Sequence, residues 1–304
     1  MATATREAYG KALAELIVEN ENVVVLDADL TKSTKTIEAK LACPKRHFNL
    51  GIAEGNMMSI AAGLAASGKI VYASSFAMFA AGRAYEQIRN SICYPHLNVK
   101  VCATHAGISV GEDGASHQCI EDLSLMRTIP EMKVFQPCDG ASTHAIIKNI
   151  ADIDGPCYVR LGRLAVEDVY DDSFTFELGK GKVLIEGSKI AIIATGLMVQ
   201  ESLKAAQKMN EMPTVVDMYS IKPIDQDLIK KLAKENEYIV TVEEHNIIGG
   251  LGSAVAEVLA EENTNCRLKR IGMNDEFGRS GKPKDLLRYY GLDAEGILEK
   301  INNL

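Results

Sequence analysis

Short runs of β-branched and aliphatic residues alternate with longer helical stretches along the whole chain. In the first half the apolar runs lie at residues 23–30, 70–76, 99–105, 132–137 and 158–161. A second series lies at residues 190–195, 215–218, 239–242 and 268–271, with helical stretches at 197–210, 226–237, 251–262 and 283–301. Continuous apolar runs are typical of parallel strands buried on both faces. Their alternation with helices predicts βαβ units and an α/β fold.

A polar stretch separates the two series of strands. It covers residues 169–182 and carries several Asp and Gly residues. The chain has 304 residues, enough for about two domains of roughly 100–200 residues each. We therefore predict two doubly wound domains, one over residues 1–167 and a smaller one over residues 183–304, joined by an exposed connector.

Charge and composition exclude several classes of function. The 33 basic residues are outnumbered by 41 acidic ones, so the chain lacks the basic surface that nucleic-acid binding requires. No apolar run approaches the ~20 residues that cross a bilayer, and residues 1–20 lack the apolar core of a signal peptide. The seven cysteines are scattered without a CxxC pair, which indicates reduced thiols and no metal site. We expect a cytoplasmic protein with no membrane or nucleic-acid partner.

The densest group of proton-transfer residues lies at residues 104–118, directly after the third predicted strand. It contains His105, Glu112, Asp113 and His117, separated by glycines. Parallel α/β sheets bind ligands beyond the carboxyl ends of their strands, and these side chains are common general acids and bases. A solvated surface loop would have the same composition, but the position favours a functional loop.

Glu54 opens a helical stretch, residues 55–67, that is apolar nearly all round. Such a helix is buried in a large core or against another subunit. Two interpretations of Glu54 stay open. Its carboxylate caps the helix, where the dipole favours a negative charge, or it is buried and unpaired, with a raised pKa suited to a proton donor for a cofactor ring nitrogen.

Two further motifs are weaker. Phe76 and Phe79 follow the second strand and would line a pocket for a flat ring, although such a pair more often belongs to the core. Gly249-Gly250-Leu251-Gly252 opens a helix after the strand at 239–242. It resembles a dinucleotide fingerprint but lacks the full G-x-G-x-x-G spacing, and close helix packing explains the glycines equally well.

Three of these motifs together resemble the transketolase family: Gly51-Ile52-Ala53-Glu54, the run from Ser75 to Gly82, and the loop at 109–118. The resemblance covers essentially the whole chain, as a pyrimidine-binding domain followed by a transketolase C-terminal domain. Full-length transketolases also carry a diphosphate-binding domain, whose Gly-Asp-Gly motif serves Mg²⁺ and thiamine diphosphate, and this sequence contains no Gly-Asp-Gly. The resemblance therefore implies one subunit of a two-component transketolase, inactive alone. The expected partner is an N-terminal subunit that binds the diphosphate and Mg²⁺ (or Ca²⁺), in an α₂β₂ heterotetramer.

The resemblance also implies roles at the cofactor. Glu54 would hydrogen-bond the aminopyrimidine ring of thiamine diphosphate. Phe76 would pack on that ring with Phe79 beside it, and Asp29 would lie close to the cofactor at the subunit interface.

On the substrate side, His105 and His117 would contact the donor and acceptor sugars, and with Glu54 they are the catalytic candidates. Asp113 would read the C2 hydroxyl of the acceptor. The substrate phosphate would be held by Ser33 and Arg163, with Arg160 as the competing arginine.

The resulting hypothesis is transfer of a two-carbon ketol unit between sugar phosphates at an active site between subunits. Three alternatives remain. The β subunit of a 2-oxo acid dehydrogenase shares the two-domain layout but needs no sugar-reading histidines. A 1-deoxyxylulose-5-phosphate synthase-like enzyme shares the run from Arg83 to Gln87. A non-catalytic homologue would have lost Glu54 or the histidines.

Overall fold

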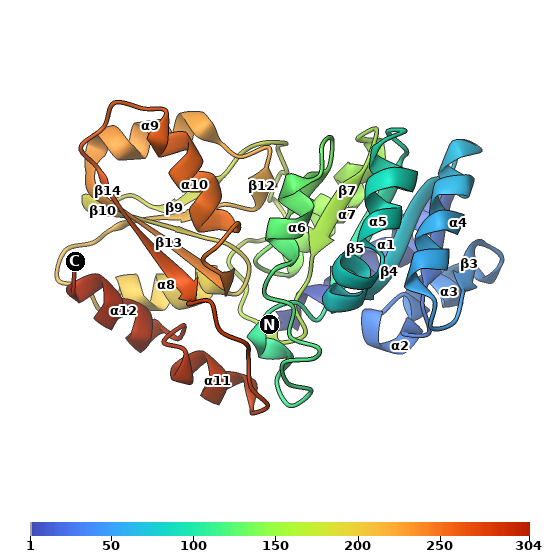
Figure 1. The fold of residues 1–304 in the computed structure, drawn as a ribbon, viewed down its shortest axis with the longest axis horizontal. Helices are drawn as coiled ribbons and strands as arrows, with labels where there is room; N and C mark the ends of the chain where they lie inside the picture. Colours follow the sequence, from blue (N-terminus) through green and yellow to red (C-terminus); the bar gives the residue numbers. More distant parts are fainter. Residues whose placement is uncertain (1) are drawn as a thin grey trace.

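The computed structural model describes residues 2–304, which form two α/β parts side by side (Figure 1). The sheet of the first part has the strand order β12-β6-β7-β5-β4-β2-β3. Its strands are β2 (Val23–Asp27), β3 (His47–Asn49), β4 (Ile70–Phe76), β5 (Val99–Thr104), β6 (Lys133–Phe135), β7 (Cys157–Arg160) and β12 (Ser220–Lys222). All pairs are parallel except β12 with β6. A short antiparallel pair, β1 (Thr3–Ala4) and β8 (Ala165–Val166), lies outside this sheet.

Alternate side chains of each strand face opposite layers of helices. Val23 and Val25 of β2 pack in the cluster of α1 (Thr5–Glu19) and α7 (Gly140–Asn149). Val24 and Leu26 pack on the other face, in the cluster of α4 (Glu54–Ala66) and α6 (Asp122–Thr128). Two π-helical segments, Met78–Arg83 and Ile88–Cys93, flank α5 (Tyr85–Gln87), and α2 (Thr31–Thr34) and α3 (Ile37–Ala42) follow β2.

The sheet of the second part has the order β14-β13-β10-β11-β9. It contains the parallel strands β10 (Lys189–Ala194), β11 (Thr214–Asp217), β13 (Asn236–Asn246) and β14 (Arg267–Met273), with β9 (Lys182–Ile185) antiparallel at one edge. One face packs against α8 (Met198–Ala206) and α12 (Ala294–Asn302), and the other against α9 (Gln226–Glu235) and α10 (Leu251–Ala260). The residues between the parts, 169–182, are exposed or half-buried throughout.

The predicted α/β fold is confirmed, and each of the nine predicted strands is present, β4 with the predicted ends and the others with shifted ends. The single helix predicted over residues 283–301 is wrong. The chain forms α11 (Pro283–Tyr289) and α12, because Gly291 adopts a left-handed conformation (φ 61°) and the carboxylate of Asp293 caps the second helix at the Gly296 N–H, 3.0 Å away. Strand β12 comes from the second half of the sequence yet completes the first sheet.

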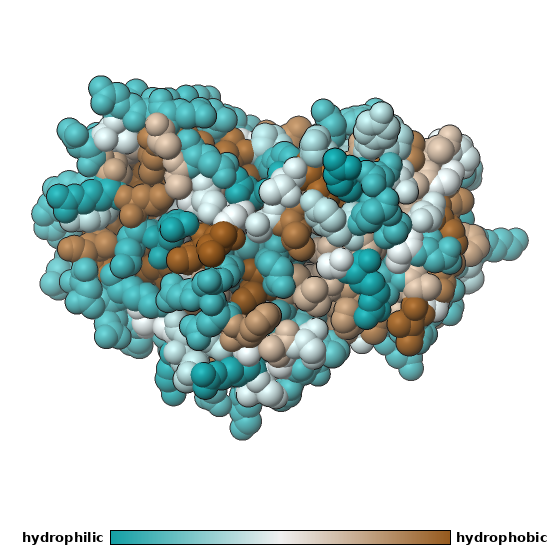
Figure 2. Space-filling view, viewed as in Figure 1, coloured by the Kyte–Doolittle hydropathy of each residue, from teal (hydrophilic) through white to brown (hydrophobic). Residues whose placement is uncertain are grey.

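Helix α4 buries one side in this chain, through Met57, Met58 and Ala61, whereas Asn56 and Ser59 are exposed. Burial of this helix on nearly all sides, as expected from its sequence, is therefore not observed within a single chain. Figure 2 shows apolar side chains in small groups among polar ones on the viewed face of the molecule, one group lying near α2. Among residues 2–304 no helix combines the length and apolar character that crossing a membrane requires.

Candidate active site

Glu54 is the first residue of α4, and 1% of its surface is exposed. Its carboxylate does not cap the helix. Instead Oε2 accepts a hydrogen bond from Arg83 Nη1 at 2.8 Å, and Oε1 accepts one from Ser75 Oγ at 3.3 Å. Burial of the Glu54 carboxylate is as expected, but both earlier interpretations fail in their detail, because the carboxylate is neither a helix cap nor unpaired.

Four rings meet beside Glu54, beyond the carboxyl ends of β4 and β5. The Phe76 ring lies 5.9 Å from that of Phe79 in a stacked arrangement and 3.9 Å from that of His105, centroid to centroid. The His117 ring meets the Phe79 ring edge-on at 5.3 Å. Phe76 is 8% exposed, so its ring packs against His105 rather than lying open to a ligand. The structure thus brings together five predicted residues on the edge of the sheet where parallel folds bind ligands.

His105 carries its proton on Nδ1 in this arrangement. Arg6 Nη1, which can only donate, lies 3.1 Å from His105 Nε2, so Nε2 accepts and Nδ1 donates to Thr104 Oγ1 at 2.9 Å. Burial, together with the charges of Arg6 and Arg163 and the neighbouring His117, lowers the pKa of His105 to about 3. The imidazole is therefore neutral at physiological pH.

We expect His105 to stay neutral through the range in which an ordinary histidine titrates, near pH 6.5. Ring ¹³C and ¹⁵N resonances of the free chain, assigned with a His105→Gln variant, should show no His105 midpoint above pH 5. Because the unfolded chain takes up this proton more readily, the contribution of His105 to stability is complete above about pH 6.5 and declines as the pH falls. A His105 midpoint near 6.5 would show that the ring is solvated.

Arg6, near the start of α1, was not among the predicted residues. Its Nη1 also donates to the backbone oxygen of Ser33 at 3.0 Å, so it joins the predicted Ser33 to His105. Burial lowers the pKa of Arg6, and the nearby charge of Arg163 contributes to that shift. Two cations beside a neutral histidine form a site that favours an anion. No local motif marks Arg6, because its partners lie 27 and 99 residues away in the sequence.

The loop that carries both histidines is held by the second part of the chain. Glu244, in β13, is buried, and its Oε1 accepts from the Ser109 N–H at 2.5 Å. Gly107 adopts φ 80°, and a Cβ there would lie 2.4 Å from the Glu244 carboxylate. This residue must therefore be glycine for the loop to pack on Glu244.

Other predicted residues lie at the edge of the ring cluster. Arg163 Nη1 donates to the backbone oxygen of Val110 and to Glu112 Oε2, the latter at 3.3 Å, and its side chain is 38% exposed. Asp29 lies on the loop after β2, where its backbone N–H donates to Asn49 Oδ1 at 3.0 Å. Asp113 is exposed on the histidine loop. The structure places neither aspartate in the ring cluster itself.

Arg160 is excluded as a ligand for phosphate. It is 1% exposed. Its Nε donates to both carboxylate oxygens of Asp122, at 2.9 and 3.0 Å, and its Nη2 donates to the backbone oxygens of Cys119 and Glu244. This guanidinium joins the two parts of the chain. Of the two arginines predicted to hold the substrate phosphate, only Arg163 remains.

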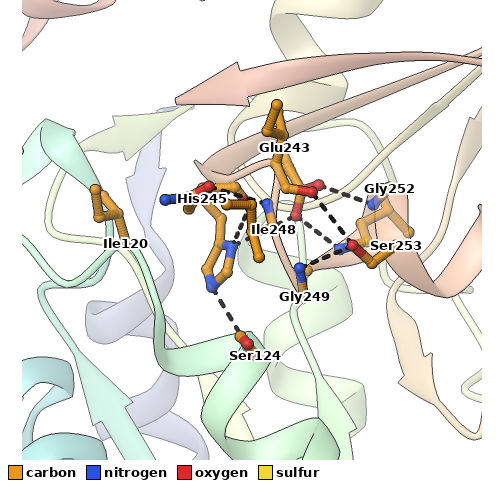
Figure 3. A network of polar contacts seen from close by, with 12 residues as sticks. Ile120, Ser124, Glu243, His245, Ile248, Gly249, Gly252 and Ser253 are labelled. Carbon is orange, nitrogen blue, oxygen red and sulfur yellow. Dashed lines mark hydrogen bonds and ion pairs between the residues drawn. The ribbon is translucent and has the colours of Figure 1, made fainter. Parts of the chain in front are cut away.

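The dinucleotide interpretation of residues 249–252 is wrong. The N–H groups that open α10, of Leu251 and Gly252, donate to the carboxylate of Glu243 at 2.7 and 2.8 Å (Figure 3). Glu243 is fully buried, and burial raises its pKa to about 7. A Cβ on Gly250 would lie 2.0 Å from Glu243 Oε2. The glycines therefore admit a carboxylate of this chain, in the place where a pyrophosphate would bind.

The chain is similar to known proteins over most of its length. The sequence matches the family described as "Transketolase, pyrimidine binding domain" over residues 1–168 and "Transketolase, C-terminal domain" over residues 179–297. The chain belongs to the transketolase family. Family membership implies dependence on thiamine diphosphate.

Several relatives of this transketolase-family chain match its full length. A protein of Methanocaldococcus jannaschii named as a transketolase C-terminal section is 54% identical, over 97% of this chain and 94% of its own. The 6-deoxy-6-sulfo-D-fructose transketolase subunit of a Clostridium species is 38% identical, over 96% of this chain and 92% of its own. A solved structure described as a split-gene transketolase, inactive β₄ tetramer, superposes with a TM-score of 0.91 at 53% identity, covering 100% of this chain and 98% of that one. Human transketolase is 35% identical over 99% of this chain but only 49% of its own length.

The donor set fits one half of thiamine diphosphate. A buried carboxylate, an aromatic pair and a neutral imidazole suit a flat aminopyrimidine ring, which presents polar groups at its edge. For the diphosphate and its metal, no group of three or more His, Cys, Asp or Glu side chains within residues 2–304 is placed to hold a metal ion. The side chains of the ring cluster have the chemistry that an aminopyrimidine ring requires.

Proposed function

We propose that this chain is the C-terminal subunit of a thiamine-diphosphate-dependent transketolase, which transfers a two-carbon ketol unit between sugar phosphates. The observation that carries the proposal is the convergence of Glu54, Phe76, Phe79, His105 and His117 at one edge of the sheet. These residues come from three separate segments of the sequence, and Glu54, His105 and His117 carry groups able to accept or donate a proton. A homologue without catalytic function has no need to keep this combination.

At the cofactor end, Glu54 would accept a hydrogen bond from the aminopyrimidine ring and hold a proton at its ring nitrogen. Thiamine diphosphate, when bound, supplies the carbon nucleophile that two-carbon transfer requires. Phe79 would contact the ring, and Asp29 would lie near the cofactor at the subunit interface. Phe76, which is packed on His105, would support the ring pocket from beneath.

At the substrate end, the half-buried His117 would contact the sugar hydroxyls directly. His105 would contact them once Arg6, which donates to its Nε2 in the free chain, turns toward the substrate phosphate. Arg163, Arg6 and the Ser33 segment would bind the phosphate, because a dianion offsets the repulsion between two guanidinium groups. Asp113, which is exposed on the same loop, would reach the C2 hydroxyl of the acceptor. Pentose phosphates are the proposed substrate class.

The proposed partner is an N-terminal transketolase subunit that binds the diphosphate and Mg²⁺, in an α₂β₂ heterotetramer. Support comes from the relative named as a transketolase C-terminal section and from the split-gene relative. Phe48 and Ile52, in the segment that leads to Glu54, are 46% and 76% exposed and would provide apolar contact area for a partner. The seven free cysteines fit the reducing cytoplasm.

The proposal is tested by measuring ketol transfer from xylulose 5-phosphate to ribose 5-phosphate with thiamine diphosphate and Mg²⁺. The assay uses this chain alone, the N-terminal subunit alone and the mixture. We expect transfer only in the mixture. Pyruvate in place of the ketose donor tests the synthase and dehydrogenase alternatives. Turnover of pyruvate with no ketol transfer from the sugar would reject the transketolase proposal.

A substitution separates the sugar contacts from cofactor binding. We expect His117→Ala in the mixture to lower turnover of sugar phosphates by about 10²-fold while thiamine diphosphate binds nearly as in the wild type, because His117 is only half-buried at the edge of the rings. His144→Ala is the matched control, since His144 pairs with Glu15 on the exposed surface. An equal loss of turnover and cofactor binding would assign His117 to the fold instead.

A further inference from the structure

Arg83 makes both of the contacts through which this site would bind a flat cofactor ring. Its Nη1 donates to Glu54 Oε2 at 2.8 Å, and its guanidinium carbon lies over the Phe79 ring, 4.7 Å from the centroid. The other oxygen of Glu54 faces Ser75 Oγ. A ring in contact with both Glu54 and Phe79 therefore needs the space that the guanidinium fills.

The energetics of this contact differ for its two partners. The side chain of Arg83 is 51% exposed, so the guanidinium regains water when it leaves. Glu54 is 1% exposed, and a buried carboxylate without a partner is strongly unfavourable. Arg83 is therefore released at small cost only when an incoming ligand offers Glu54 another hydrogen-bond donor. An aminopyrimidine ring that carries an N–H at its edge meets this condition.

The local backbone places Arg83 where such a movement is feasible. It ends the π-helical segment Met78–Arg83, and the next residue, Ala84, leaves helical geometry with φ −105° and ψ 19°. Single π-helical turns occur frequently at functional sites. The side chain thus projects from a break between two helical segments rather than from the middle of a regular helix.

We infer that Arg83 competes with the aminopyrimidine ring for Glu54 and thereby lowers the affinity of the assembled enzyme for thiamine diphosphate. This inference rests on the proposed function. Arg83 leaves Glu54 when the cofactor binds and returns when the cofactor dissociates, so the free subunit keeps its buried carboxylate paired.

The test is titration calorimetry of thiamine diphosphate, with Mg²⁺, into the complex of this chain with its N-terminal partner. We expect Arg83→Gln to bind the cofactor about tenfold more tightly than the wild type, the factor that a partly exposed, charge-assisted hydrogen bond is worth. Arg89→Gln is the matched control. The side chain of Arg89 is exposed and bonds only its neighbour Asn90 among the described contacts, so this variant should bind as the wild type does.

A second variant guards against a loss of assembly. Arg83→Met keeps an apolar stem over Phe79 but no charge, and it should also bind the cofactor more tightly. Equal or weaker binding in both variants would overturn the inference, because Arg83 would then support the bound state. A wild-type complex that takes up no thiamine diphosphate would overturn the proposed function itself, so the two failures give different results.

Discussion

Glu54→Gln in the assembled enzyme is expected to lower the turnover of ketol transfer by at least about 10²-fold. Glutamine fills the same space at the start of α4 and still accepts a hydrogen bond from Arg83, but its amide cannot hold a proton at the cofactor ring. The loss should therefore appear in kcat, measured by coupled assay with saturating sugar phosphates and cofactor.

The fold should survive this change. Arg83 is half exposed, and water can solvate it when its partner loses charge. Glu86→Gln is the control, because the side chain of Glu86 is exposed and bonds only Gln87 and Asn90 among the described contacts. A Glu54→Gln enzyme with turnover within about threefold of the wild type would remove Glu54 from the proton-holding role.

Arg160→Met and Arg163→Met should separate a structural arginine from a functional one. Removing Arg160 leaves the buried Asp122 without its cation, which typically costs about 3–5 kcal/mol of unfolding free energy. Removing Arg163, whose side chain is 38% exposed, should change stability by less than about 0.5 kcal/mol. Urea unfolding of each variant measures both values.

The effects of the two variants on KM should have the opposite order from their effects on stability. In the mixture with the partner, Arg163→Met should raise the KM for sugar phosphates by about tenfold or more, since a charge-assisted hydrogen bond to phosphate is worth about 1.5–3 kcal/mol. Arg160→Met, where enough folded protein remains, should leave KM near the wild-type value. A stable Arg160→Met variant with a raised KM would contradict the assignment of Arg160 to the join between the two parts.

The strands that could be predicted are those with a recognisable run of buried apolar residues in the sequence. The strands are recognisable because parallel strands are buried on both faces, so that runs such as residues 23–27 and 99–104 are apolar at nearly every position. Strand β12 was missed because three residues carry no pattern, and its place in the first sheet depends on pairing with β6, more than 80 residues earlier. The break between α11 and α12 depends on one left-handed glycine.

Candidate site residues that follow strands could be predicted from the sequence. Contacts between segments that are far apart in the sequence could not. Phe76 ends β4 and His105 directly follows β5, so their neighbourhood follows from the topology of a parallel sheet. Arg6 and the pairing of Arg83 with Glu54 have no counterpart in local spacing, since each joins segments brought together only by packing. The prediction for residues 249–252 failed for the opposite reason, because a local spacing pattern is present there without the function that it usually indicates. Their spacing resembles an anion-binding turn, and only the structure shows that Glu243 supplies the anion.

On the proposed function, the cofactor site is complete only between this chain and an N-terminal subunit. The most direct measurement is calorimetric titration of thiamine diphosphate, with Mg²⁺, into this chain alone, the partner alone and an equimolar mixture. We predict high-affinity binding at one site per pair of chains in the mixture, and much weaker binding to either chain alone. Binding of full affinity to this chain by itself would contradict the claim, because the chain would then hold the diphosphate and its metal with its own residues.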